Sequence, residues 1–208
     1  MRTLQIVYRT LIGLGFVSAA YASAGVIESE WAQARAGRAF AEARLGSSGD
    51  ARLEPARNTL VPSRMPSPER GEPVGRIEIP RIDLSAMVLE GDDARTLRRG
   101  VGHLARTPLP GEGGNTCLAG HRDTFFRALK DVRVGDVIRF ATLHDAYAYR
   151  VDSLLIVDPG DVWVLGPSSE PTLTLVSCYP FYFVGRAPKR FVVRASAYTS
   201  AVDELTRY

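Results

Sequence analysis

The segment PTLTLVSCYPF, residues 171–181, predicts a β-strand that ends in a cysteine. Two sets of side chains alternate along it with the period of a strand: Leu173, Leu175 and Ser177 on one side, and Thr174, Val176 and Cys178 on the other. The run stops at a Tyr-Pro pair, which is typical of a turn. A thiol at the end of a strand is either packed or presented to solvent, and the alternation by itself favours packing.

Seven further short apolar runs lie between residues 76 and 198, so the chain from about residue 74 is expected to be mostly β, as a barrel or a sandwich. Turn signals such as Pro-Gly and Gly-Glu-Gly-Gly separate the runs. Helical candidates are brief and include RTLRRG and DTFFRALK. The eight runs are RIEIP, AMVLEG, NTCLAG, DVIRF, AYAYRVDSLLIV, DVWVL, LTLVSC and RFVVRASAY.

The length and the charge of the chain narrow its class. With 208 residues, of which 45% are hydrophobic, it can bury one sizeable core and carry a tail. The formal net charge is +3, from 26 basic and 23 acidic residues that form no dense basic patch. Nucleic-acid binding, which needs such a patch, is therefore not expected.

Residues 1–27 are expected to form an N-terminal membrane anchor. Residues 10–27 carry no charge, and Arg2 and Arg9 precede them, so the N-terminus should stay in the cytoplasm. The alternative is a cleaved signal peptide, because Ala22-Ser23-Ala24 resembles a cleavage site. The first reading gives a single-pass membrane protein with an extracytoplasmic domain, and the second a secreted protein.

Residues 28–73 are expected to connect this segment to the domain. The part from 28 to 46 is rich in Ala, Glu and Arg and predicts a helical stalk. The part from 47 to 73 contains five prolines among polar residues and predicts a flexible linker. The catalytic or binding domain would then span residues 74–200, followed by a tail at 201–208.

Three histidines could serve a catalytic thiol, which reacts as the thiolate and needs a base or a cation nearby. His121 closes the run TCLAGH and precedes an apparent helix start, where Asp123 would be an N-terminal helix residue or a supporting group. His103 lies in a loop rich in Gly and Pro and would either hydrogen-bond within the loop or line a site. His144 lies in a polar turn and is expected to be exposed.

Arg190 opens the apolar run that follows Cys178. If the two strands are neighbours, its guanidinium could be brought beside the thiol and hold an oxyanion or a peptide carbonyl. On composition alone, other basic residues are equal candidates: Arg186, Lys189 and Arg194.

Three ordered motifs resemble the sortases, the cysteine transpeptidases of bacterial surfaces. LAGHRDTFF is followed 57 residues after its histidine by TLVSCYPF and then by KRFVVRA. The family pattern is a Thr-Leu-x-Thr-Cys strand with an upstream histidine and a downstream arginine. The resemblance covers about residues 74–198, and GHRDTFF and CYPF are similar to class D and to related Gram-negative sortases.

The resemblance implies a closed eight-stranded β-barrel with short helices and assigns roles to residues. Cys178 matches the nucleophile, His121 the residue that protonates the leaving amine, and Arg190 the arginine that holds the substrate and the tetrahedral intermediate. Four other residues are expected in substrate-binding or supporting roles: Thr174, Ser177, His103 and Asp123. No metal or other cofactor is implied.

The implied reaction is cleavage of an LPxTG-like sorting signal of an exported protein through a thioacyl enzyme, followed by transfer of the acyl group to an amine acceptor. The partners would be the sorting peptide, an amine on a cell-wall precursor or another protein, and the membrane. A tether with a flexible spacer would keep the domain near such substrates.

Two alternatives stay open. The chain could be an inactive sortase-like module that binds a peptide without cutting it, or a zinc-binding module that uses Cys117, His121, Cys178 and His103, although their spacing fits no zinc motif. Cys117 is expected to be a small core residue, with a disulfide or a regulatory thiol as the other possibilities.

Overall fold

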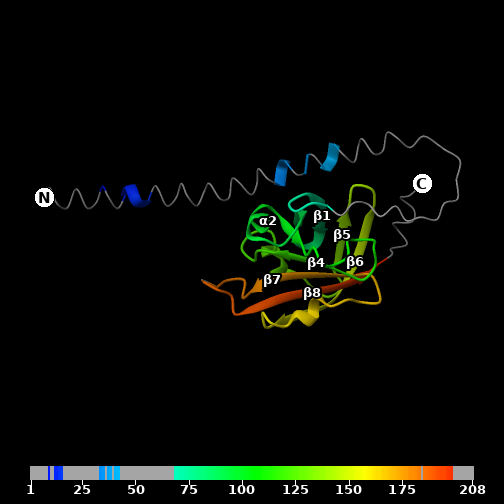
Figure 1. Ribbon diagram of the computed structural model, residues 1–208. Helices are drawn as coiled ribbons and strands as arrows, with labels where there is room; N and C mark the ends of the chain where they lie inside the picture. Colours follow the sequence, from blue (N-terminus) through cyan, green and yellow to red (C-terminus); the bar gives the residue numbers. More distant parts are fainter. Residues whose placement is uncertain are drawn as a thin grey trace, which may run out of the picture.

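Eight strands close into a barrel in the computed structural model, which describes residues 68–183 and 185–198 and short pieces at 9, 12–15, 33–35, 37–38 and 40–42. The strand order is β1-β2-β3-β4-β7-β8-β6-β5, and Figure 1 shows β7 and β8 lying side by side. The predicted mostly β, closed eight-stranded barrel is thus confirmed. The strands are β1 Pro73–Ile79, β2 Leu84–Glu90, β3 Val101–His103, β4 Asn115–Gly120, β5 Val137–Ala141, β6 Ala146–Val157, β7 Thr172–Tyr179 and β8 Lys189–Ala197.

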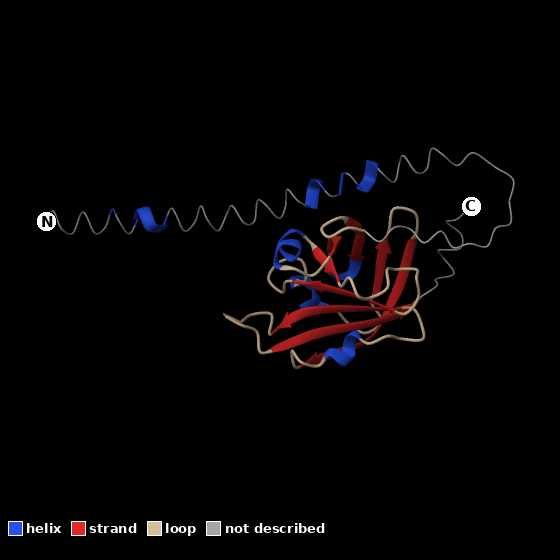
Figure 2. Cartoon of the chain, in the orientation of Figure 1, coloured by secondary structure: helices blue, strands red, loops and turns tan. Residues whose placement is uncertain are grey.

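Helices are short and lie between the strands (Figure 2). The α-helix α2, Ala94–Arg99, begins after Asp93, whose carboxylate accepts the N–H groups of Arg95 and Thr96. This is an ordinary N-terminal cap, which satisfies two backbone donors that a helix leaves unpaired. The other helical segments are 3-10 turns: η1 Pro80–Ile82, η2 Arg127–Asp131 and η3 Val162–Leu165.

Two strand pairs are parallel, β2 with β3 and β4 with β7, and the remaining pairs are antiparallel. Parallel neighbours end at the same edge of a sheet. The connection from β4 to β7 therefore brings the C-terminal ends of two strands together, although more than 50 residues separate them in sequence. This pairing positions the site described below.

The core fills the barrel with apolar side chains from every long strand. On β7, Leu173 and Leu175 point into it, as the alternation predicts, and both are fully buried. Burial of one such side chain stabilises a fold by about 1.5–3 kcal/mol. The largest fully buried members include Phe126, Phe140, Ile77, Ile79, Leu118, Leu129 and Ile138.

Two of the sequence-based element predictions are wrong. The run DVWVL is the 3-10 segment η3 and not a strand, because only Val164 is buried while Val162 and Trp163 are exposed. The strand that completes the barrel is β3, whose three residues are too few to show a period of two.

The helical prediction for DTFFRALK is met only in its second half, because residues 122–126 form turns before η2 begins at Arg127. Asp123 therefore does not lie at a helix N-terminus.

The predicted stalk contacts the barrel where the structure describes it. Residues 33–35, 37–38 and 40–42 are helical, and Phe40 is buried. The Gln33 side chain donates to the Arg99 carbonyl at 2.7 Å and accepts the Met87 N–H at 2.7 Å. Its amide thus joins this segment to the backbone of β2 and of the turn after α2.

Several predicted segments lie wholly or largely outside the described residues: the membrane anchor at 1–27, the linker at 47–73 up to residue 67, and the tail at 201–208. Within the part of the chain that the structure describes, no helix has the length and apolar character needed to span a bilayer.

Candidate active site

Cys178 lies where the sheet loses one of its strands. The last residue pair between β4 and β7 joins Gly120 to Ser177, whereas the pairing of β7 with β8 continues and places Arg190 directly opposite Cys178. Ser177 is buried, but Cys178 is partly exposed. The thiol thus has a strand neighbour on the β8 side alone, and the side left by β4 is where the chain turns away at His121.

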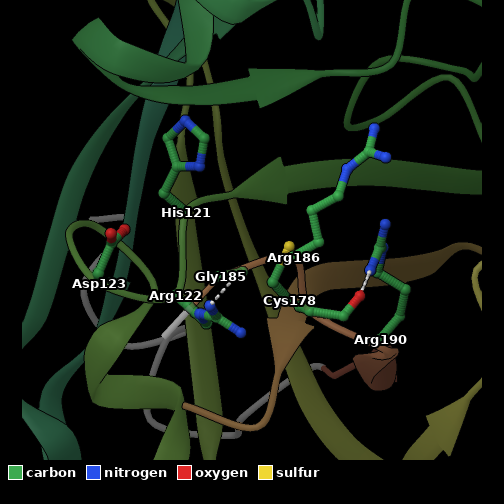
Figure 3. A pocket seen from close by; sticks show the side chains of 8 residues that line it. His121, Arg122, Asp123, Cys178, Gly185, Arg186 and Arg190 are labelled. Atoms are coloured by element: carbon green, nitrogen blue, oxygen red, sulfur yellow. Dashed lines mark hydrogen bonds between the residues drawn. The ribbon is translucent and has the colours of Figure 1, made fainter. Parts of the chain in front are cut away.

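His121 directly follows β4, so the parallel pairing brings it to the edge where β7 ends. Its carbonyl accepts the N–H of Phe126 at 3.0 Å, which closes the turn after the strand. His121, Cys178 and Arg190 line one pocket of about 510 Å³, and Figure 3 shows His121 on one side of Cys178 and Arg190 on the other. Three elements distant in sequence therefore meet in a single hollow.

The remaining lining residues come from the turn after β4 and from the β7–β8 loop, residues 180–188. Asp123 is exposed and lies in the pocket wall without acting as a helix cap. The complete lining is His121, Arg122, Asp123, Cys178, Gly185, Arg186, Ala187 and Arg190.

Among the basic residues that compete with Arg190, the register separates the candidates. Arg190 is opposite Cys178, whereas Lys189 forms an ion pair with Asp158 at 2.8 Å and Arg194 is opposite Thr174, four residues earlier on β7. Arg186 does line the pocket. The Arg190 Nη1 donates to the carbonyls of Lys189 at 3.0 Å and Ala187 at 3.4 Å, which fixes the guanidinium at the pocket wall.

Ser177 and Thr174 do not reach the pocket. The Ser177 hydroxyl donates to the Gly120 carbonyl at 3.0 Å, and the Thr174 hydroxyl donates to Oδ1 of Asn115 at 2.7 Å. Both side chains are buried, so their hydroxyl groups join β7 to β4. The prediction that they bind substrate is therefore corrected: a buried hydroxyl already paired inside the sheet is not available to a peptide.

His103 is also a structural residue. It is buried at the end of β3, with Nδ1 2.7 Å from the Glu90 carboxylate and Nε2 3.2 Å from both the Pro108 carbonyl and the Thr107 hydroxyl. It is absent from the described lining of the pocket. Of the two roles expected for it, hydrogen bonding within the fold is right and lining the site is wrong.

Cys117 is a buried core residue, as expected. It is fully buried on β4, and burial raises the pKa of its thiol to about 11. Both cysteines are free thiols in the structure. Among the described residues, no three His, Cys, Asp or Glu side chains gather in a way that could hold a metal ion, so the four residues of the zinc alternative do not form a site.

Arg122 is the pocket residue that sequence reasoning missed. Its guanidinium reaches the carbonyls of residues 58 to 63 positions further along the chain. The motif GHRDTFF contains this arginine, but nothing in the sequence indicates which distant groups it contacts.

Comparisons with known proteins agree with this geometry. A family model described as a sortase domain matches residues 77–198. The chain is similar to sortase D of Bacillus subtilis (strain 168), with 32% identity over 187 residues that cover 88% of this chain and 93% of that protein.

Solved structures show the same fold. A sortase D5 transpeptidase from Clostridium perfringens superposes with a TM-score of 0.63 at 24% identity, over 83% of this chain and 99% of that one. Sortase C1 from Streptococcus suis gives a TM-score of 0.58 at 30% identity, over 64% of this chain and 77% of that one.

Proposed function

The chain belongs to the sortase family of cysteine transpeptidases, and from this we propose that it cleaves an LPxTG-like sorting signal through a thioacyl enzyme on Cys178. The observation that carries the proposal is the single pocket in which Cys178, His121 and Arg190 meet. A partly exposed thiol with a histidine and an arginine beside it has the groups that acyl transfer requires: a nucleophile, a proton carrier and a fixed positive charge.

In the first half of the reaction the Cys178 thiolate attacks the carbonyl carbon of the threonine in the peptide. The carbonyl π electrons move to oxygen, and the tetrahedral intermediate then expels the glycine nitrogen. His121, as the imidazolium, gives its proton to that nitrogen, so the leaving group departs as a neutral amine. The product is a thioester between the threonine acyl group and Cys178.

Arg190 holds the developing oxyanion or a neighbouring peptide carbonyl. Its position opposite Cys178 in the β7–β8 register fixes the guanidinium close to the reacting thiol. A guanidinium carries five N–H donors, and Nη1 donates to two backbone carbonyls of the chain. The other donors can be directed at substrate, where fixed charges of this kind stabilise a transition state.

In the second half an amine acceptor attacks the thioester. His121, now neutral, removes a proton from the incoming nitrogen, the C–S bond breaks, and the Cys178 thiolate is restored with a new amide bond as product. Water can replace the amine and release a carboxylic acid, which is the slower reaction. The acceptor would be an amine of a cell-wall precursor or of another protein.

Such chemistry places the domain outside the cytoplasm. We propose that residues 1–27 anchor the protein in the membrane with the N-terminus inside, the secreted form being the alternative. A tethered domain meets exported substrates in the same membrane at a raised effective concentration.

The test uses the full chain with a library of fluorogenic LPxTG-type peptides and a panel of small amines. Wild type should form an adduct on Cys178 that mass spectrometry identifies as the acyl fragment, and an added amine should divert the product from acid to amide. Cys178→Ala should form neither, whereas the matched variant Cys117→Ala should behave as wild type. Release of product by Cys178→Ala would refute the nucleophile, and binding of a peptide without any adduct would favour the inactive module.

A further inference from the structure

Arg122 joins the two segments that border Cys178. Its Nη1 donates to the Pro180 carbonyl at 2.9 Å, and its Nη2 donates to the carbonyls of Phe183 at 2.7 Å and Gly185 at 3.0 Å. The guanidinium carbon also lies 5.7 Å from the centre of the Phe183 ring. One side chain from the turn after His121 therefore binds the β7–β8 loop at three points.

The loop has few other polar attachments. Among the described residues, no backbone–backbone hydrogen bond joins residues 180–188 to another part of the chain. Phe181 anchors the base of the loop by packing against Tyr179 and Phe191. Beyond that base Tyr182 is 72% exposed. The far half of the loop, which supplies the pocket wall, is thus fixed chiefly by Arg122.

We propose that Arg122 is a positioning residue that sets the distance between the His121 turn and the loop wall formed by Gly185, Arg186 and Ala187. This inference rests on the proposed function, because the wall it positions is the one a sorting peptide would contact beside Cys178. The arginine itself does not touch the reacting atoms. It acts through the loop, and the loop shapes the groove.

Arginine suits this task for a geometric reason. The planar guanidinium holds its donors in a rigid fork, so Nη1 and Nη2 reach carbonyls that are three and five residues apart in the loop. A lysine ammonium is a compact point charge that keeps the positive charge but not the fork. The two explanations of Arg122, its charge and its shape, are therefore separated by Arg122→Lys.

The experiment compares Arg122→Lys and Arg122→Ala with wild type as full chains. The control is Arg127→Lys, because Arg127 touches the same loop only through the Tyr182 ring, at 5.8 Å. Four quantities are measured: the melting temperature, kcat and KM for the sorting peptide, the rate of Cys178 alkylation by iodoacetamide, and the rate of chymotrypsin cleavage after Tyr182 or Phe183. None of these substitutions adds or removes a chymotrypsin site.

Both Arg122 variants should be cleaved faster in the loop and should lose about 10- to 100-fold in kcat/KM, mostly through KM, because small displacements of a positioning contact cost that much. Alkylation of Cys178 should keep its wild-type rate, since a small reagent does not need the wall. Arg127→Lys should match wild type in all four measurements.

The proposal is overturned if Arg122→Lys restores wild-type KM and loop cleavage, since charge would then suffice. It is equally overturned if kcat and alkylation fall together at constant KM, which would mean that Arg122 acts on the thiol. If wild type turns over no peptide, the proposed function fails, whereas chymotrypsin cleavage still decides whether Arg122 holds the loop.

Discussion

Alkylation should distinguish the two cysteines of the folded chain by a large factor. Burial raises the pKa of Cys117 from the ordinary 9.0 to about 11. At pH 8 the thiolate fraction of Cys117 is then about 10⁻³, roughly a hundredfold below that of a thiol with the ordinary value, because each unit is a factor of ten. Since the thiolate is the reacting form and Cys117 is also fully buried, iodoacetamide should modify Cys178 alone.

A disulfide between the two is excluded by the register. Cys117 is opposite Thr174, and Cys178 lies four residues further along the same strand. At about 3.3 Å per residue the two cysteines are about 13 Å apart along the sheet. A disulfide needs Cα atoms within about 7 Å. Oxidants should therefore not inactivate the protein by joining Cys117 to Cys178.

Peptide mapping by mass spectrometry checks both statements on the full chain, alkylated at pH 8 with and without denaturant. Native protein should carry one label, on Cys178, and denatured protein should carry two. Cys117→Ala should keep the native rate of Cys178 labelling. Labelling of Cys117 in native protein at a rate near that of Cys178, or a Cys117–Cys178 cross-link, would refute the reasoning.

Three further outcomes follow from packing and charge. Ser177→Ala should lower the free energy of unfolding by about 1 kcal/mol, the value of one hydrogen bond, and leave KM unchanged; a rise in KM at unchanged stability would return Ser177 to substrate binding. Gly120→Ala would place a Cβ 2.6 Å from the Phe126 ring, so thermal unfolding should show a loss of about 1–3 kcal/mol and peptide turnover should fall because His121 is adjacent. The hydrogen bond from Arg81 lowers the pKa of Asp136 below its ordinary 3.8, so this pair stabilises the fold above about pH 4 and the contribution is lost as pH falls through the lowered pKa. Urea unfolding at a series of acidic pH values should show that loss in wild type and a weaker pH dependence in Asp136→Asn.

The strands that could be predicted are those long enough to show alternation. On β7 the period of two placed Leu173 and Leu175 inside the barrel. A period cannot be read from the three residues of β3, and the apolar run of η3 looks like a strand although only Val164 faces the core. Apolar content alone does not separate a strand from a 3-10 turn, because both can bury a residue.

For the site, sequence reasoning succeeded where a motif marks a strand end and failed where contacts are distant. Cys178 and Arg190 are opposite each other because both flank the same β7–β8 turn, so their closeness follows from local connectivity. Thr174 and Ser177 were expected to meet substrate, but their burial depends on β4, which is more than 50 residues away in sequence. Arg122 was missed for the same reason.

Unequal strand lengths explain how β7 can present its thiol. Thr174, Val176 and Cys178 share one face of the strand, yet Thr174 is fully buried while Cys178 is partly exposed. The side-chain period is the same for both, so the difference must come from neighbours. β4 accompanies β7 as far as Ser177 and then turns away at His121. A longer β4 would pair with Cys178 and cover it, which means that the end of β4 exposes the thiol and delivers the histidine in the same step.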